Sequence, residues 1–281
     1  MNPEAPPNGM TEDLRAFQAK TIEDAQKLGK STAVLLVGSR GAGLARPTSD
    51  LDLWLIGDKE TLPPDQRKLY DERGELFVDR GDWNWNAHYK FHDERDLRKR
   101  LADWRDPWPW MLKRSVILLD DTGRAAQLKS EYELMPREIQ ERGLCRWLLT
   151  FREALIWMKG DGMNGATARL LAVSRCLEAL CKVCCFADGV PPPYPKWLRL
   201  EAERTRVGMR LRDVLDVVLR ETDNVTLGAE GRDFRTVSPI KELRELRDGR
   251  LARELNELGW SAPWIDDPMR WLWVLFHERD V

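Results

Sequence analysis

The chain of 281 residues lacks a long hydrophobic run. No segment approaches the roughly 18 consecutive apolar residues that a membrane-spanning helix needs. The start of the sequence, residues 1–7, also lacks the basic and apolar segments of a secretory signal. We therefore expect a cytoplasmic protein with no membrane partner.

An excess of positive charge is also missing. The sequence has 45 Lys and Arg residues against 47 Asp and Glu residues. A general nucleic-acid binder usually carries a basic domain, so this balance argues against that class. It does not exclude a local basic patch.

Cysteine is scarce, with five residues in the whole chain. An odd number in segments with a helical pattern favours reduced thiols. Cys181 and Cys184 have the spacing of a metal-binding or redox pair. The chain lacks a second pair at zinc spacing, which argues against a zinc site.

What the chain does contain is a small glycine turn after a short apolar strand. Residues 33–37 are all apolar and predict a buried strand, and Gly38-Ser39-Arg40-Gly41 follow directly. Glycine lets backbone N–H groups approach a ligand closely, and Ser39 adds a hydroxyl donor. Successive N–H groups in such a turn form an anion-binding concavity. This pattern predicts a phosphate site.

Two carboxylates follow in a second strand. In residues 50–56 the leucines alternate with Asp50, Asp52 and Trp54, so the two aspartates share the face opposite the leucines. Side chains two apart on a strand lie about 7 Å from each other along the backbone and can converge on two metal ions about 3.5–4 Å apart. Carboxylates, water and phosphates are the ligands that Mg²⁺ prefers.

Gly38-Ser39 with Ser49-Asp50-Leu51-Asp52 resembles the signature of the DNA polymerase β-like nucleotidyltransferase superfamily. The resemblance is greatest to the minimal and the antibiotic nucleotidyltransferases. It implies transfer of NMP from an NTP, with ATP favoured, and release of pyrophosphate. Two Mg²⁺ ions, or Mn²⁺ in their place, would be bound by Asp50 and Asp52. Gly38 and Ser39 would hold the triphosphate, and Arg40 beside them is added to the predicted nucleotide-binding residues.

The resemblance also implies a third acid from a following strand. Asp79 ends one strand-like segment, and Asp82 begins the alternating segment 82–91. If the aromatic residues of that segment face the core, Asp82 faces the site, so we favour Asp82 as catalytic residue and metal ligand and keep Asp79 as the alternative. His88 and His92 would lie about 13 Å apart on one strand. This distance argues against a histidine metal site, and we expect His88 to be a polar lining residue.

The chain is long enough for two domains. We predict an α+β fold: residues 1–10 as a disordered lead, residues 11–135 as a polymerase β-like nucleotidyltransferase domain with a mixed sheet and helices, and residues 136–281 as an α-helical bundle. Helices are expected at 11–29, 65–73 and 94–104, and four apolar stripes of helical period follow residue 136. In the antibiotic enzymes such a bundle helps to form the acceptor cleft, and a homodimer is expected only by analogy.

Lys196 follows the proline-rich segment 188–195 and begins a basic stretch. Such a stretch is usually a solvated helix face paired with acids. The alternative is that Lys196 reaches the triphosphate. The acceptor is not readable from these residues and is a small molecule, a tRNA or a protein. A second function class also stays open: a degenerate member of the fold that binds nucleotide or a partner without catalysis.

Overall fold

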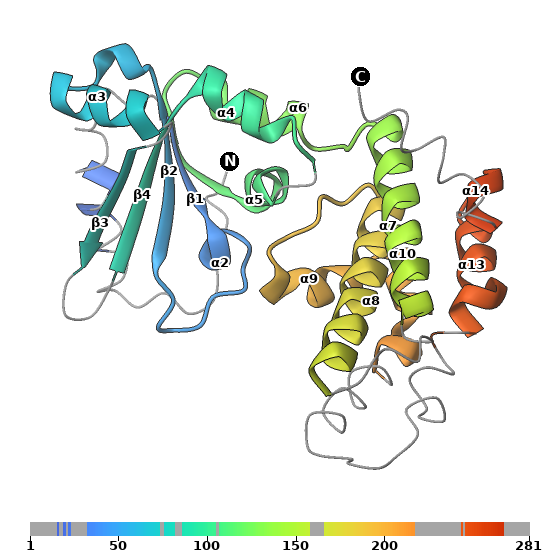
Figure 1. Ribbon diagram of the computed structural model, residues 1–281. Helices are drawn as coiled ribbons and strands as arrows, with labels where there is room; N and C mark the ends of the chain where they lie inside the picture. Colours follow the sequence, from blue (N-terminus) through green and yellow to red (C-terminus); the bar gives the residue numbers. More distant parts are fainter. Residues whose placement is uncertain are drawn as a thin grey trace. The chain divides into compact units, whose positions relative to one another are not determined.

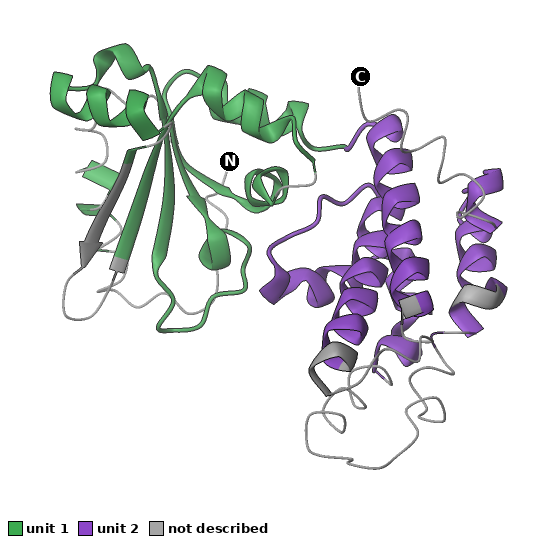
Figure 2. Ribbon diagram, viewed as in Figure 1, with its two compact units in different colours: residues 1–134 green, residues 135–281 purple. Residues whose placement is uncertain are grey.

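The computed structural model describes residues 33–73, 76–81, 86–104, 107–157, 166–216 and 245–266, together with residues 16, 19, 20, 22, 23 and 243. The predicted lead of residues 1–10 lies outside this part of the chain, as does most of the helix expected at 11–29. The chain divides into two compact units, residues 1–134 and 135–281 (Figure 2). Each unit is described by itself.

The first unit is built on a five-stranded mixed sheet with the strand order β3-β4-β2-β1-β5 (Figure 1). Its strands are β1 (Ala33–Val37), β2 (Leu51–Gly57), β3 (Leu76–Gly81), β4 (Asn86–Asp93) and β5 (Val116–Asp120). β2 runs parallel to β4, whereas the other neighbouring pairs are antiparallel. The predicted mixed sheet is thus confirmed.

One face of the sheet carries the hydrophobic core. Every residue of β1 is buried, because this strand lies between β2 and β5. The core cluster takes alternate residues from β2 and β4 and also includes Leu62 and Tyr70 near and within α3 (Pro64–Arg73). Its members on the two strands are Leu51, Leu53, Leu55, Ala87, Tyr89 and Phe91. The predicted alternation therefore holds, and the remaining positions of β2 and β4 belong to the opposite face.

That opposite face is partly covered by α5 (Trp108–Arg114). Trp54 of β2 stacks on Trp108 with ring centroids 4.7 Å apart, and His92 of β4 meets both rings edge-on. These aromatic side chains fill the part of the face beyond Asp52. The carboxylates at the beginning of β2 stay partly open to solvent as a result.

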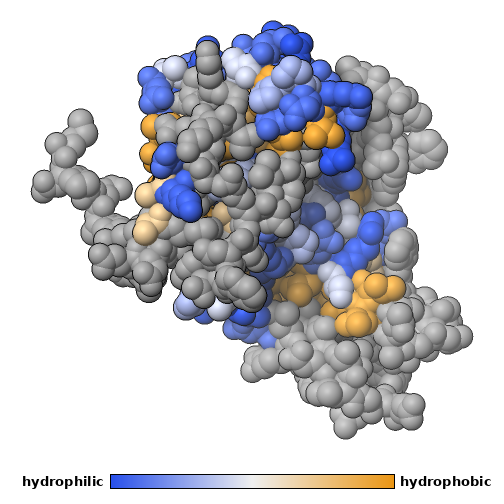
Figure 3. All heavy atoms as spheres, turned by 90° about the vertical axis from the view of Figure 1, so that its left-hand side faces the viewer, coloured by the Kyte–Doolittle hydropathy of each residue, from blue (hydrophilic) through white to orange (hydrophobic). Residues whose placement is uncertain are grey.

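Short helices complete the first unit. They are α2 (Gly38–Gly41), the 3-10 turn η1 (Lys59–Thr61), α3, α4 (Glu94–Leu101), α5 and α6 (Arg124–Glu131). The helix expected at 94–104 ends at Leu101, and Asp93 caps its N-terminus by accepting from the N–H of Arg95. α3 is mostly charged, and the upper described surface in Figure 3 is correspondingly hydrophilic.

The second unit is helical in its described residues. Its elements are α7 (Arg137–Trp157), α8 (Ala166–Ala187), α9 (Pro195–Ala202), α10 (Arg206–Arg210), the π-helical turn η3 (Leu246–Arg250), α13 (Leu251–Glu257) and α14 (Pro263–Asp266). α7 packs along α8, and α9 contacts α8 (Figure 1). Within the described residues, no helix combines the length and apolarity that crossing a membrane requires.

All five cysteines are buried among the apolar side chains of α7 and α8. Burial raises the pKa of Cys145, Cys176 and Cys181 to about 12. It also raises the pKa of Cys184 and Cys185 well above the usual value. Neutral thiols in such surroundings behave as small hydrophobic residues.

Candidate functional site

Gly38 brings the backbone of the glycine turn against the Asp52 carboxylate. Its φ of +65° is a left-handed value that favours glycine. A Cβ atom at this position would lie 2.2 Å from Oδ2 of Asp52. Only a residue without a side chain therefore allows this approach. Ser39 follows in α2 and is buried.

Arg40 holds the loop that leads to the two aspartates. Its Nε donates to the carbonyl of Ser49 at 2.9 Å and to that of Asp50 at 3.1 Å. One terminal nitrogen also donates to the carbonyls of Pro47 and Ser49. A planar guanidinium fixes several acceptors at once. The Arg40 side chain therefore sets the backbone position of Asp50, just before β2 begins.

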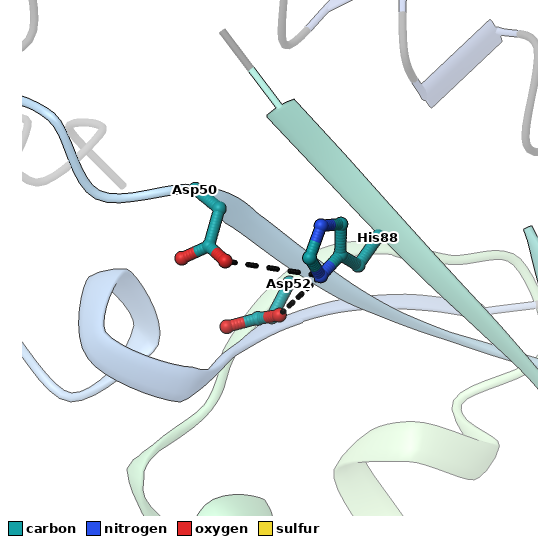
Figure 4. Close-up of side chains that lie close together, drawn as sticks. All are labelled: Asp50, Asp52 and His88. Atoms are coloured by element: carbon teal, nitrogen blue, oxygen red, sulfur yellow. Dashed lines mark ion pairs between the residues drawn. The ribbon is translucent and has the colours of Figure 1, made fainter. Parts of the chain in front are cut away.

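His88 completes a three-residue cluster with these aspartates. In the parallel register of β2 and β4 it stands beside Asp52. Its Nδ1 lies 3.7 Å from Oδ2 of Asp50 and 3.7 Å from Oδ1 of Asp52, and Figure 4 shows both carboxylates turned toward the imidazole ring. The side chains are 42%, 35% and 31% exposed for Asp50, Asp52 and His88, so solutes can reach them.

The cluster can hold a divalent cation. One donor atom from each of the three side chains lies within 4.8 Å of the others. Two donors that each lie about 2.1 Å from an ion are about 3.0 Å apart at right angles and about 4.2 Å apart when opposite. The 3.7 Å separations from the imidazole nitrogen fall inside that interval. Among the residues that the structure describes, this is the only such group of three or more potential ligands.

A cation would also offset the repulsion between the two carboxylates. Like charges held close together disfavour each other's ionised form, and an opposite charge between them removes that penalty. Arg40 supplies part of this compensation, since it interacts electrostatically with Asp50. Burial nevertheless lowers the pKa of Arg40, and this burial effect exceeds the attraction to Asp50.

The aromatic end of the same face is buried and is flanked by two cationic side chains, Lys90 and Arg100. His92 is buried, and its Nε2 lacks a hydrogen-bond partner among the described residues. Burial, and then the charges of Arg100 and Lys90, lower the pKa of His92 to about 3. Both cations lie over the ring of Trp108, at 5.0 and 5.6 Å from its centroid. His92 is therefore a neutral packing residue.

The remaining predicted site residues are Asp79, Asp82 and Lys196. Asp79 lies in β3 opposite His88 in the strand register, and its side chain is not among those that the structure describes. Asp82 lies outside the described residues. Lys196 belongs to α9 in the second unit, where its Nζ lies 4.2 Å from the ring centroid of Trp197. The roles predicted for these three residues stay predictions.

His88 is the cluster member that the sequence analysis treated only as a lining residue. The alternation of residues 82–91 placed it on the polar face together with Asp82, but the register of β4 against β2 could not be read from that alternation. The signal in the sequence that pointed toward His88 was the expected mixed sheet, in which a later strand pairs with the strand that carries the aspartates. β4 is the strand that pairs with β2 beside Asp52, and His88 is the residue of β4 in register with Asp52.

Comparison with known proteins gives a family match for part of the first unit. The model of a family described as the nucleotidyltransferase domain matches residues 19–103, which include β1 to β4 and the cluster. A search of the curated proteins finds no match. Among solved structures, the chain is similar to the nucleotidyltransferase-like protein from Exiguobacterium sibiricum 255-15, with 16% identity, 95% of this chain and 80% of that chain covered, and a TM-score of 0.43.

Proposed function

Because residues 19–103 of this chain form a nucleotidyltransferase domain, we propose that the protein transfers a nucleotide from an NTP to an acceptor and releases pyrophosphate. ATP is the favoured donor, and the acceptor is a hydroxyl-type group on a small molecule, a tRNA or a protein. The observation that carries the proposal is the pair Asp50 and Asp52 beside the Gly38-Ser39 turn.

The residues of the first unit divide the work between them. The backbone N–H groups of the Gly38-Ser39 turn bind the triphosphate. The lack of a side chain at Gly38 lets this backbone lie directly against the Asp52 carboxylate. Asp50 and Asp52 hold divalent cations, Mg²⁺ in the first place, and Arg40 keeps Asp50 in position. Bound divalent cations stabilise negative charge on the attacking and leaving oxygens of an in-line displacement. Asp82 or Asp79 is proposed as the acid that receives the acceptor's proton.

One specific observation supports a second candidate function. His88, rather than a carboxylate, lies beside Asp52 on β4. A site with two carboxylates carries less negative charge than one with three, so it compensates the charge of two divalent cations less completely. The alternative is therefore a protein that binds nucleotide through the same turn but does not transfer it.

The test compares label transfer in matched variants. The protein is incubated with α-labelled ATP, GTP, CTP or UTP and cell extract, and labelled fractions and pyrophosphate are measured. Asp50→Asn and Asp52→Asn should abolish both signals while the thermal unfolding midpoint stays within a few degrees. Asp65→Asn, which removes an exposed carboxylate from α3, should leave both unchanged.

Two results would count against nucleotide transfer. Full labelling by the Asp50→Asn and Asp52→Asn variants would refute the assigned site. ATP binding by calorimetry, with no pyrophosphate release on any acceptor fraction, would favour the nucleotide-binding alternative.

A further inference from the structure

We propose that His88 is a metal ligand of the site and gives it a preference for a transition-metal cation, with Mn²⁺ as the probe, over Mg²⁺. This inference rests on the proposed function, because it assumes that Asp50 and Asp52 bind a divalent cation. The imidazole Nδ1 lies 3.7 Å from an oxygen of each aspartate, so a single ion between them meets all three donors.

The position of His88 is set by the sheet. β4 runs parallel to β2, and the register places His88 beside Asp52 and Ala87 beside Leu51. Ala87 is in the hydrophobic core, so the pleat turns His88 to the face that carries the aspartates. A slip of β4 by one residue would turn its core side chains to the opposite face, so core packing on both strands fixes this register. The imidazole is held at the site by the fold.

The chemistry of the donor set follows from the ligand types. Mg²⁺ is a hard cation that takes oxygen ligands in near-ideal octahedral geometry. First-row transition ions accept imidazole nitrogen more readily, and affinity for mixed nitrogen and oxygen sites generally rises from Mn²⁺ toward Cu²⁺. Two carboxylates with one imidazole therefore favour transition ions more than three carboxylates would. A carboxylate at position 88 would restore the all-oxygen set.

The competing explanation is that His88 only pairs with the aspartates as a counter-ion. Its distance of 3.7 Å to each carboxylate is compatible with an ion pair when the ring is protonated. The two explanations differ in one observable: a ligand nitrogen couples magnetically to a bound paramagnetic ion, whereas a displaced counter-ion does not.

The experiment measures Mn²⁺ binding to the full chain without nucleotide. Pulsed electron paramagnetic resonance reports ¹⁴N coupling to the bound ion, and competition with Mg²⁺ gives the ratio of the two dissociation constants. The wild type and the Asp65→Asn control should both show ¹⁴N coupling. His88→Asp should abolish the coupling and lower the preference for Mn²⁺ over Mg²⁺ by roughly tenfold or more. His88→Gln, which adds no charge, provides a second variant and should also lose the coupling.

Distinct outcomes overturn the inference and the proposed function. Bound Mn²⁺ without ¹⁴N coupling, or an unchanged ratio in His88→Asp, overturns the ligand role of His88, and nucleotide transfer then stands on its own assay. Loss of Mn²⁺ in Asp82→Asn or Asp79→Asn, with coupling absent in the wild type, assigns the third position to that acid instead. Mn²⁺ binding that is insensitive to Asp50→Asn and Asp52→Asn overturns the metal site altogether.

Discussion

Replacing Gly38 by alanine tests how the glycine turn and the Asp52 carboxylate depend on each other. Gly38 has a φ of +65°, which for a residue with a side chain costs about 1–2 kcal/mol. The new Cβ would also stand 2.2 Å from Oδ2 and 3.0 Å from Cγ of Asp52. Ordinary contact begins near 3.4 Å, so the carboxylate or the turn must move by more than 1 Å.

Two measurable effects follow from Gly38→Ala. A loss of about 1–2 kcal/mol corresponds to a fall in the unfolding midpoint of a few degrees, at roughly 2–4 °C for each kcal/mol. A displacement of about 1 Å at a reacting centre can lower the rate by roughly 100-fold. We therefore expect a folded protein with nucleotide transfer reduced by about two orders of magnitude and weaker Mn²⁺ binding.

The chain offers a matched control in Gly43→Ala. Gly43 has a φ of +70°, and a Cβ there would meet nothing within 4 Å. This variant shares the backbone strain of Gly38→Ala but not the contact with Asp52. Equal losses of Mn²⁺ affinity and activity in the two variants would refute the reasoning. A double-mutant cycle with Asp52→Ala adds a second check, because removing the Asp52 carboxylate should relieve part of the destabilisation caused by Gly38→Ala.

Three further outcomes are expected. Arg40→Lys keeps the charge but loses the planar guanidinium that holds residues 47–50. Calorimetry should therefore show a lower affinity for Mn²⁺. A change in ATP affinity alone would instead make Arg40 a nucleotide contact. Burial lowers the pKa of His92 to about 3. Below about pH 6.5 the His92 imidazole therefore binds a proton in the unfolded chain but not in the folded protein. The free energy of unfolding should fall between pH 6.5 and pH 3 by up to about 1.4 kcal/mol for each pH unit. Urea titrations should show a shallower pH slope for His92→Phe, and equal slopes would exclude this assignment. Thiol labelling at pH 8 should find almost no reactive cysteine in the native protein and all five after unfolding; rapid labelling of the native protein would contradict their burial.

The strands that carry the site were accessible to sequence reasoning because their patterns are local. The alternation of leucines with Asp50 and Asp52 fixes which side chains share a face, and the structure places the leucines in the core as expected. Gly38 could be recognised as a turn residue for the same reason. The family resemblance of these residues agrees with the domain match over residues 19–103.

The partner of the aspartates across the sheet was not accessible in this way. Whether His88, Asp82 or another residue of segment 82–91 stands beside Asp52 depends on the register of β4 against β2, which lies in contacts between strands more than thirty residues apart. The alternation of residues 82–91 pointed to Asp82 as a third acid, which stays a prediction because Asp82 lies outside the described residues. The residue that the sheet brings beside Asp52 is His88.

The sequence by itself determined that a glycine turn precedes two carboxylates on one strand face, because this pattern is local, and it predicted nucleotide transfer from that pattern. Tertiary structure decided the composition of the site. The parallel pairing of β4 with β2 places an imidazole beside the two carboxylates, and the left-handed turn at Gly38 sets the backbone against Asp52. The position of the imidazole and the approach of the Gly38 backbone to Asp52 both depend on close packing. Packing sets distances of a few ångströms between residues that are far apart in the sequence, and spacing along the chain does not specify them.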